Sequence, residues 1–293
     1  MTSIPFNSML IASALLIWST GGVFVRVLGV DVPTLMFYSF FISALAQSLM
    51  FIKPGMRKEL PPPSALPRLA ALSAIALVNT FTLYYAYSAT SISNAIFTHY
   101  IAPVLVVVLA RIFLNEPITA RCMAAVAFAT AGLWIMFGGA DIAGALGGGI
   151  APGSNLSGIA AGLVSGVAYA VIILLVKVFT RDINPYVLVF VQNVIMSAAL
   201  LPFAHRVPFD ALWKLAALSI LSSTLAPFLY YRGIKYIQAN RAAILGYIEP
   251  LGAIMSGMIF LGEAPGASSL VGGVLIVLSG WMVIRKAVVN GRT

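Results

Sequence analysis

Charged residues are scarce in this sequence, and their scarcity excludes an ordinary soluble domain. Only 9% of the 293 residues are charged, whereas 61% are hydrophobic and the mean hydropathy is +1.01. Soluble domains carry charge at roughly 25% of their positions. The few charges are unbalanced, with 17 Lys and Arg against 8 Asp and Glu. In a soluble protein this excess would point to nucleic acid, but here it flanks apolar runs, so no nucleic-acid partner is expected.

Cysteine and histidine are almost absent, which excludes several kinds of site. Cys122 is the single cysteine, so no internal disulfide or cysteine-ligated metal cluster can form. His99 and His205 are too few and too far apart to resemble a zinc or haem site. The sequence also contains no G-x-x-x-x-G-K-S/T loop, no H-E-x-x-H and no paired intramembrane aspartates. We therefore expect no enzyme, no catalytic residue, no metal and no cofactor.

Long apolar runs are what the sequence does contain. Most approach the roughly 20 residues that cross a hydrocarbon core as a helix, and none alternates polar and apolar residues as a barrel strand would. The sequence predicts an all-α polytopic membrane protein with ten transmembrane helices, multi-pass in the cell (bacterial inner) membrane. No Lys or Arg precedes the first run, which argues against a cleaved signal peptide. The predicted helices are Met9–Val27, Thr34–Ile52, Leu69–Ala89, Ala95–Leu114, Cys122–Phe137, Leu156–Val176, Pro185–Phe203, Leu212–Tyr231, Ala242–Leu261 and Ser268–Ile284.

The basic residues predict the orientation of these helices. If the chain starts inside the cell, every Lys and Arg except Arg26, Arg206 and Lys214 falls in an inner loop or at an inner helix end. Such a bias follows the positive-inside rule, so both termini are expected in the cytoplasm. An even number of membrane crossings agrees with this placement.

The chain also repeats itself. A shift of 147 residues aligns Tyr100 with Tyr247 and Pro103 with Pro250, and it also aligns Glu116 with Glu263 and Trp134 with Trp281. We predict a first five-helix repeat at 1–137, a glycine-rich linker at 138–155 and a second repeat at 156–293. Because five is odd, the second repeat enters the membrane upside down. Inverted repeats of this kind are a design of secondary transporters.

Three segments carry a family resemblance. Trp18-Ser19-Thr20-Gly21-Gly22, Tyr247-Ile248-Glu249-Pro250 and Phe260-Leu261-Gly262-Glu263 resemble the drug/metabolite transporter superfamily, EamA type. The resemblance implies ten helices, of which the first four in each half surround a central cavity while the fifth and tenth are peripheral. The first half has Ala102-Pro103 in place of Glu-Pro, which rules out a symmetric pair of carboxylates. Trp18-Ser19-Thr20 and Tyr100 more weakly resemble the YddG-like aromatic amino-acid exporter branch.

Glu249 is the only carboxylate well inside a predicted helix. A charge there is costly against lipid, so the side chain is expected to face a cavity or a partner. Two interpretations stay open. Glu249 either binds a proton or a substrate amine, or it satisfies backbone carbonyls that Pro250 releases.

The other candidates are polar or aromatic side chains in helices that the resemblance places around the centre. His99 either relays protons in a cavity or is a hydrogen-bonded packing residue, and the aromatic residues either stack on a ligand or pack the core. Asn79, Gln192 and Asn193 are expected to bond between helices, and Asn79 is also a candidate for binding a zwitterion. The predicted substrate-binding or cavity residues are Trp18, Asn79, Tyr84, His99, Tyr100, Tyr169 and Glu249; the predicted helix breaks or gating residues are Gly21, Gly22, Pro103 and Pro250.

Several residues receive purely structural predictions. The stripe Gly158-x-x-x-Gly162-x-x-x-Gly166 predicts tight packing of one helix on a neighbour. Glu116 is expected to cap the helix that follows it. Trp213 and Tyr231 are assigned to the aromatic belt at the membrane surface.

Together these features predict a transporter of small metabolites, secondary active or facilitative, that works by alternating access. Amino acids, aromatic or hydrophobic, are the leading substrates and export the leading direction; nucleosides or cationic compounds are the alternative, and a channel stays open. The expected partners are the small-molecule substrate, the lipid bilayer and, if transport is coupled, protons. A monomer is expected.

Overall fold

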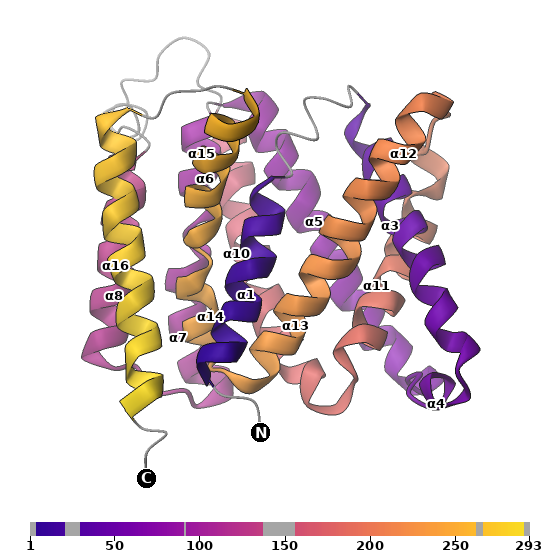
Figure 1. Cartoon of the computed structure of the whole chain (residues 1–293), viewed down its shortest axis with the longest axis horizontal. Coiled ribbons are helices and arrows are strands. Elements are labelled where there is room, and N and C mark those ends of the chain that lie inside the picture. Colours follow the sequence, from indigo (N-terminus) through magenta and orange to yellow (C-terminus); the bar gives the residue numbers. More distant parts are fainter. Residues whose placement is uncertain (1–3, 21–29, 91, 137–155, 262–265, 290–293) are drawn as a thin grey trace.

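The computed structural model describes residues 4–20, 30–90, 92–136, 156–261 and 266–289. These residues fold into a bundle of helices that run mostly parallel or antiparallel to one another, and they form no strand (Figure 1). The helices have bounds α1 Ile4–Ser19, α3 Val32–Ser48, α4 Pro54–Arg57, α5 Leu66–Ala89, α6 Ile92–His99, α7 Ala102–Leu114, α8 Ala120–Met136, α10 Leu156–Asp182, α11 Pro185–Leu200, α12 Phe209–Leu218, α13 Ala226–Tyr236, α14 Ala239–Leu245, α15 Ile248–Leu261 and α16 Ala267–Val289. Short 3₁₀ turns η1 Leu49–Ile52, η2 Pro63–Ala65 and η3 Leu201–Phe203 flank α3, α5 and α11, and a π-helix, η4 Ser219–Leu225, joins α12 to α13.

The predicted runs agree in order with these helices, but several ends differ by five or six residues. The sixth, eighth and tenth runs were expected to end at Val176, Tyr231 and Ile284, whereas α10, α13 and α16 end at Asp182, Tyr236 and Val289. The first run was expected to begin at Met9, whereas α1 begins at Ile4. Ile4, Pro5 and Phe6 are apolar, and proline suits the first turn of a helix because its missing N–H would have no partner there. The rest of that run, from residue 21 to Val27, lies outside the described residues.

Length and composition alone let six of the described segments cross a membrane as single helices. Ile4–Ser19, Ala120–Met136 and Ala267–Val283 are apolar but shorter. At 1.5 Å per residue the 16 residues of α1 span about 24 Å, somewhat less than the roughly 30 Å of a hydrocarbon core. The all-α membrane fold is confirmed, and the count of ten crossings stays a prediction.

The helices pair in layers that follow one another across the bundle (Figure 1). α8 packs on α16 at one edge, and the broken helices α6–α7 and α14–α15 come next. α1 and α10 lie in the middle, followed by α5 and α13, and α3 and α11 close the far edge. The fifth and last predicted helices, now α8 and α16, are therefore peripheral, as the family resemblance implied.

The two halves are inverted with respect to each other. Near the end of α10, the Lys177 ammonium donates hydrogen bonds to the carbonyls of Ile234, Lys235 and Ile237 at the end of α13. The start of α1 meets the same part of α13, because a methyl group on Gly233 would lie 2.7 Å from the carbonyl oxygen of Asn7. The first helix of one half thus begins where the first helix of the other half ends.

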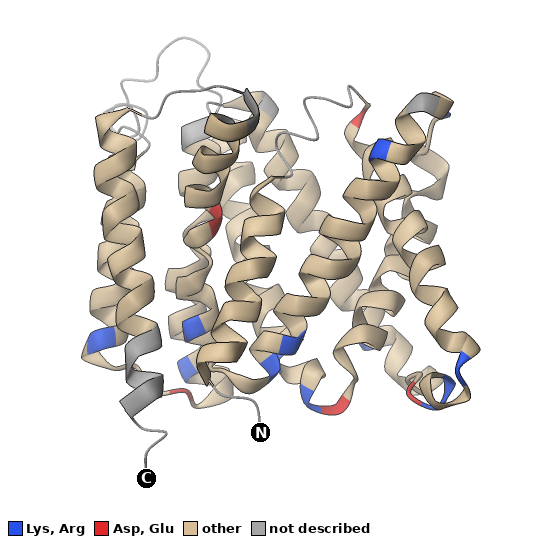
Figure 2. Ribbon diagram, in the orientation of Figure 1, with Lys and Arg blue, Asp and Glu red and all other residues tan. Residues whose placement is uncertain are grey.

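Most of the Lys and Arg positions coloured in the ribbon lie at this end of the bundle, hereafter the basic end (Figure 2). The start of α1 and the last turns of α16 lie there too (Figure 1). The positive-inside rule makes this the cytoplasmic end, and that orientation stays a prediction.

Candidate functional site

Two helices of the bundle are broken at equivalent points. α6 ends at His99 and α7 begins at Ala102, while α14 ends at Leu245 and α15 begins at Ile248. Pro103 and Pro250 follow the two breaks, and each lacks the N–H that would bond the carbonyl four residues earlier. Discontinuous helices inside a membrane are tolerated where protein or a cavity surrounds the freed backbone groups. Pro103 and Pro250 lie just after these breaks, and their role as helix-break or gating residues stays a prediction; Gly21 and Gly22 lie outside the described residues.

Two tyrosines connect the breaks to each other. The Tyr100 hydroxyl donates to the carbonyl of Gly246 at 3.4 Å, and the Tyr247 hydroxyl donates to the carbonyl of Tyr100 at 3.4 Å. The ring centroids lie 5.5 Å apart, and both side chains are buried. Thr130 on α8 also bonds the Tyr247 hydroxyl at 2.9 Å. Each half therefore supplies a hydroxyl that bonds the opened backbone of the other half.

Glu249 lies beside this crossing. Its Oε2 accepts a hydrogen bond from the Tyr100 hydroxyl at 3.1 Å, and its Oε1 has no hydrogen-bond partner among the described residues. The carbonyl of Gly246, which Pro250 releases, is bonded by the Glu249 backbone N–H at 3.0 Å and by Tyr100, not by the carboxyl group. The structure thus gives no support to the purely structural interpretation of Glu249.

A three-residue network links α5, α6 and α10. The Asn79 amide donates to the carbonyl of Ser165 at 2.9 Å and to its hydroxyl at 3.0 Å. That hydroxyl donates to the Asn79 carbonyl at 3.0 Å and contacts His99 Nδ1 at 2.9 Å. The expected interhelical bonding of Asn79 is confirmed.

This network bears on the tautomer of His99. The Ser165 hydroxyl has one hydrogen, and both the Asn79 carbonyl and His99 Nδ1 lie within its reach. With that hydrogen on the Asn79 carbonyl, Nδ1 of His99 donates to the Ser165 oxygen. The neutral ring then carries its lone pair on Nε2, which has no hydrogen-bond partner in the described part of the chain. In this tautomer His99 offers Nε2 as an acceptor at the edge of the network with Asn79 and Ser165.

Aromatic rings surround Glu249 and His99. Tyr169 stacks on the His99 ring at 5.1 Å, and Tyr100 meets it edge-on at 5.3 Å. Tyr84 contacts Tyr87 at 6.2 Å. Tyr100 also bonds Glu249, so Glu249, Tyr100, His99 and Tyr169 form one cluster, hereafter the tyrosine cluster.

Trp18 of α1 contacts Tyr230 and the π-helix. Its ring lies 5.4 Å from that of Tyr230, and its indole N–H donates to the carbonyl of Ser222 in the π-helix at 2.9 Å. Asn79, His99, Tyr100, Tyr169 and Glu249 are thus joined by direct contacts or through Ser165, while Trp18 contacts Tyr230 and Tyr84 contacts Tyr87. That this group lines a water-accessible cavity stays a prediction.

The π-helix is a feature that the sequence analysis missed. Its widened turns leave carbonyls without their usual partners, and side chains of three other helices bond them. Besides Trp18, Asn193 of α11 donates to Ser223 at 2.8 Å and Ser43 of α3 donates to Ser219 at 2.8 Å. The available signal was Pro227, one turn after a run of hydroxyl side chains in an apolar segment.

Ser165 and Tyr247 were also missed as site residues. Ser165 gives no signal of its own, because it sits in the glycine stripe of α10, where it reads as one more small packing residue. Tyr247 could have been found, since it is the repeat partner of Tyr100.

The structural predictions had mixed outcomes. Gln192 and Asn193 do bond between helices, the former accepting from Tyr231 at 2.6 Å. Tyr231 is therefore a buried core residue, and its assignment to the surface belt was wrong. Glu116 does cap a helix, but a distant one: its two carboxylate oxygens accept from the N–H groups of Ala239 and Asn240 at the start of α14.

The side chains of the site offer polar groups and aromatic faces. Within residues 4–20, 30–90, 92–136, 156–261 and 266–289, no group of three or more His, Cys, Asp and Glu side chains could hold a metal ion. What the arrangement offers is one carboxylate oxygen, one imidazole acceptor, tyrosine hydroxyls and aromatic faces, which together suit a small polar molecule with an apolar part.

The EamA-like transporter family matches residues 6–138 and 156–285, nearly all of both halves. The chain belongs to the EamA-like transporter family. It is 29% identical to an uncharacterized transporter of Archaeoglobus fulgidus over 280 residues, which cover 94% of this chain and 96% of the relative. It is 25% identical to the uncharacterized transporter YxxF of Bacillus subtilis over 210 residues, 68% of this chain and 63% of the relative.

A solved crystal structure shares this fold. Its TM-score is 0.78 at 20% sequence identity, with 96% of this chain and 97% of the other covered. The predicted resemblance to the drug/metabolite transporter superfamily is thereby confirmed, as is a multi-pass membrane protein. This EamA family member is a transporter of small molecules, and its family does not specify the substrate.

Proposed function

We propose that this EamA protein carries zwitterionic amino acids with aromatic or hydrophobic side chains, by alternating access around the two broken helices. The main support is the pair of hydrogen bonds by which Tyr100 and Tyr247 join the two helix breaks. The breaks occupy equivalent positions in the two inverted halves, and Tyr100 also bonds the Glu249 carboxylate there. Inverted repeats place equivalent gates on opposite faces of the membrane.

The chemistry of the cluster fits such a substrate. Oε1 of Glu249 accepts a hydrogen bond from the substrate ammonium, and the Tyr100 hydroxyl on Oε2 holds the carboxylate in place. The faces of Trp18 and Tyr169 accept an apolar or aromatic side chain. Nε2 of His99 accepts from a hydroxyl or N–H group on that side chain.

Donors for the substrate carboxylate are also present. The hydroxyls of Ser222 and Thr224 in the π-helix are buried and without hydrogen-bond partners among the described residues. A buried hydroxyl without a partner is unfavourable, so a ligand that accepts from it gains affinity. The Trp18 indole N–H bonds the Ser222 carbonyl, so this segment of the π-helix lies beside the Trp18 ring.

Counterflow in proteoliposomes tests the proposal. Vesicles loaded with each of the twenty amino acids in turn would be assayed for uptake of the labelled compound, with Glu249→Gln protein as the matched control. We expect accelerated, saturable exchange for a subset that includes the aromatic amino acids, and loss of that exchange in the variant. Exchange that does not saturate would indicate a channel, and exchange of none of the twenty would reject amino acids as the substrate.

One observation favours a second substrate class. Glu249 is partly exposed and has no basic partner among the described residues, so an organic cation without a carboxylate would also be bound. Cationic drugs and nucleosides therefore belong in the same assay. A cation that exchanges faster than any amino acid would favour this alternative, and a pH gradient that drives either exchange would reveal proton coupling.

A further inference from the structure

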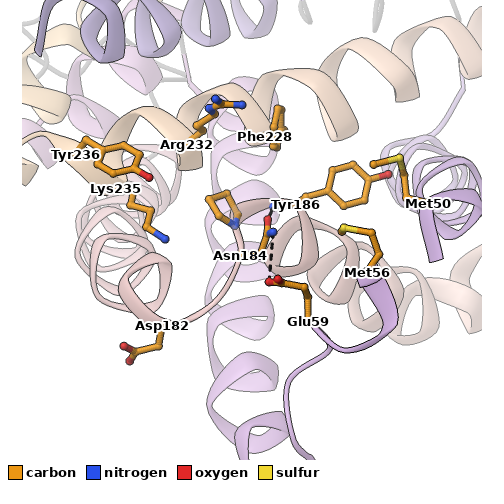
Figure 3. Close-up of a pocket in the computed structure, with 11 residues that line it drawn as sticks. Met50, Met56, Glu59, Asp182, Asn184, Tyr186, Phe228, Arg232, Lys235 and Tyr236 are labelled. Atoms are coloured by element: carbon orange, nitrogen blue, oxygen red, sulfur yellow. Dashed lines mark hydrogen bonds between the residues drawn. The ribbon is translucent and has the colours of Figure 1, made fainter. Parts of the chain in front are cut away.

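A hollow lies at the basic end, away from the tyrosine cluster (Figure 3). It has a volume of about 460 Å³ and is formed by α13, the turn between α10 and α11, and the segment η1–α4. This volume lies in the range of small-molecule sites. Its lining residues come from both halves: Met50, Met56, Glu59, Asp182, Asn184, Pro185, Tyr186, Phe228, Arg232, Lys235 and Tyr236.

This hollow is hereafter called the wedge. The directions of the surrounding helices explain why it stays open. α3 packs against α12 and the π-helix, while α13 diverges from it toward the basic end. Tyr186 of α11 forms the back wall, because its hydroxyl bonds the carbonyl of Gln47 at 3.2 Å and its ring meets Phe228 at 5.9 Å. Asn184 bonds Glu59 across the two halves at 3.4 Å (Figure 3).

Two cations line the wedge without an acidic partner. Arg232 and Lys235 lie one turn apart on α13, and neither forms an ion pair with any described residue. Glu59 and Asp182 are the acidic residues of the same lining (Figure 3). A ligand that contacts all four residues needs an anionic oxygen group for Arg232 and Lys235 and an amine for the two acids.

The remaining walls are apolar. Met50, Met56, Phe228 and Tyr236 line the wedge. The π-helix η4, which leads into α13, carries Leu221 and Leu225, which are 36% and 39% exposed. Exposed leucines in a membrane-spanning segment suit contact with acyl chains. The ligand therefore combines a charged head at the basic end with an apolar tail that follows these leucines.

We propose that the wedge binds one phospholipid with an ethanolamine headgroup. Its phosphate contacts Arg232 and Lys235, its ammonium contacts Glu59 and Asp182, and one acyl chain lies along Leu225 and Leu221. Basic pockets between membrane helices recognise lipid head groups in this way. Free phosphoethanolamine shares the head chemistry but has no tail.

Native mass spectrometry of delipidated protein in detergent tests the site. The probes are short-chain phosphatidylethanolamine, phosphatidylcholine and phosphatidylglycerol, with O-phosphoethanolamine as the tail-less competitor. We expect phosphatidylethanolamine to bind about tenfold more tightly than phosphatidylcholine, whose quaternary ammonium donates no hydrogen bond.

Variants assign the contacts. Arg232→Gln with Lys235→Gln lowers phosphatidylethanolamine binding about tenfold, and Glu59→Gln with Asp182→Asn removes the preference over phosphatidylcholine. The control variant, Arg111→Gln with Arg121→Gln, changes two exposed residues outside the wedge. It leaves phosphatidylethanolamine binding and the preference over phosphatidylcholine unchanged.

Three outcomes would overturn the proposal. Equal binding of the three lipids means that no headgroup is recognised, and wild-type binding by the Arg232 and Lys235 double variant removes the phosphate contact. Competition by O-phosphoethanolamine at the same concentration as the lipid identifies a site for a soluble metabolite. None of these measurements depends on transport, so they stand apart from the amino-acid proposal.

Discussion

The two broken helices have the same backbone plan and different chemistry. In α6–α7 the break is followed by Ala102-Pro103, and the residue at the break is His99, held in a network with Ser165. In α14–α15 the break is followed by Glu249-Pro250, and the residue at the position of His99 is Gly246. Both halves contain the break, and their polar groups differ. One half supplies the carboxylate and the other the imidazole, so the site as a whole is asymmetric.

The largest expected effect comes from removing the Glu249 carboxylate, the group that only the second break supplies. Glu249→Gln keeps the side-chain volume and the bond from Tyr100 but removes the negative charge that receives an ammonium. We expect exchange to fall about 100-fold, because losing one partner of a charged contact that the bound substrate covers costs roughly 2 to 5 kcal/mol. Flux in proteoliposomes measures this, and an unchanged melting temperature in detergent shows that the fold is kept. Wild-type exchange in the variant would contradict the proposed role.

The packing of α10 against the first break offers a test of stability. A methyl group on Gly166 would lie 2.6 Å from the carbonyl oxygen of His99 and 2.8 Å from Ile101. We expect Gly166→Ala to lower the free energy of unfolding by about 1 to 3 kcal/mol, since backbone there cannot yield easily. Gly280→Ala is the matched control, because no atom lies within 4 Å of its added methyl. Equal melting temperatures for the two variants would mean that α10 does not constrain the break.

The paired tyrosines sharpen the comparison, because the same change in each half removes different bonds. Tyr100→Phe loses the bonds to Glu249 and to the Gly246 carbonyl, whereas Tyr247→Phe loses those to Thr130 and to the Tyr100 carbonyl. We expect Tyr100→Phe to lower exchange about tenfold and Tyr247→Phe to lower mainly stability, by about 1 kcal/mol. Exchange and melting temperature, measured on both proteins, separate the two effects. Identical losses of exchange would show a symmetric role for the pair.

The His99 tautomer predicts the smallest effect. His99→Asn places an amide donor where Nδ1 stands and keeps the Ser165 bond, while it deletes the acceptor at Nε2. His99→Gln does the reverse. We expect His99→Asn to keep its stability and to lose about fivefold in affinity for tyrosine relative to phenylalanine, and His99→Gln to melt at a lower temperature. Competition of unlabelled tyrosine and phenylalanine in the exchange assay measures the ratio; no change of the ratio in His99→Asn would contradict the Nε2 contact.

Much of the architecture could be predicted from the sequence. Apolar runs of membrane length predicted the helices, because the bilayer requires each crossing to satisfy its own backbone. Pro103 and Pro250 predicted both breaks, since a missing N–H is a local property of the chain. Glu249 stood out for an equally local reason, as a charge in an apolar segment.

Only the tertiary structure decided what these groups contact. Glu116 was expected to cap the next helix and instead caps α14, and Tyr231 was assigned to the membrane surface and instead bonds Gln192 in the core. The Tyr100–Glu249 bond, the His99–Ser165 contact and the donors to the π-helix likewise join residues from different helices. The sequence by itself determined which groups must be buried and where helices break, because burial and hydrogen-bonding capacity belong to single residues. Their partners depend on which faces of the helices meet, and the nearly uniform apolarity of these helices leaves no periodic signal for that choice.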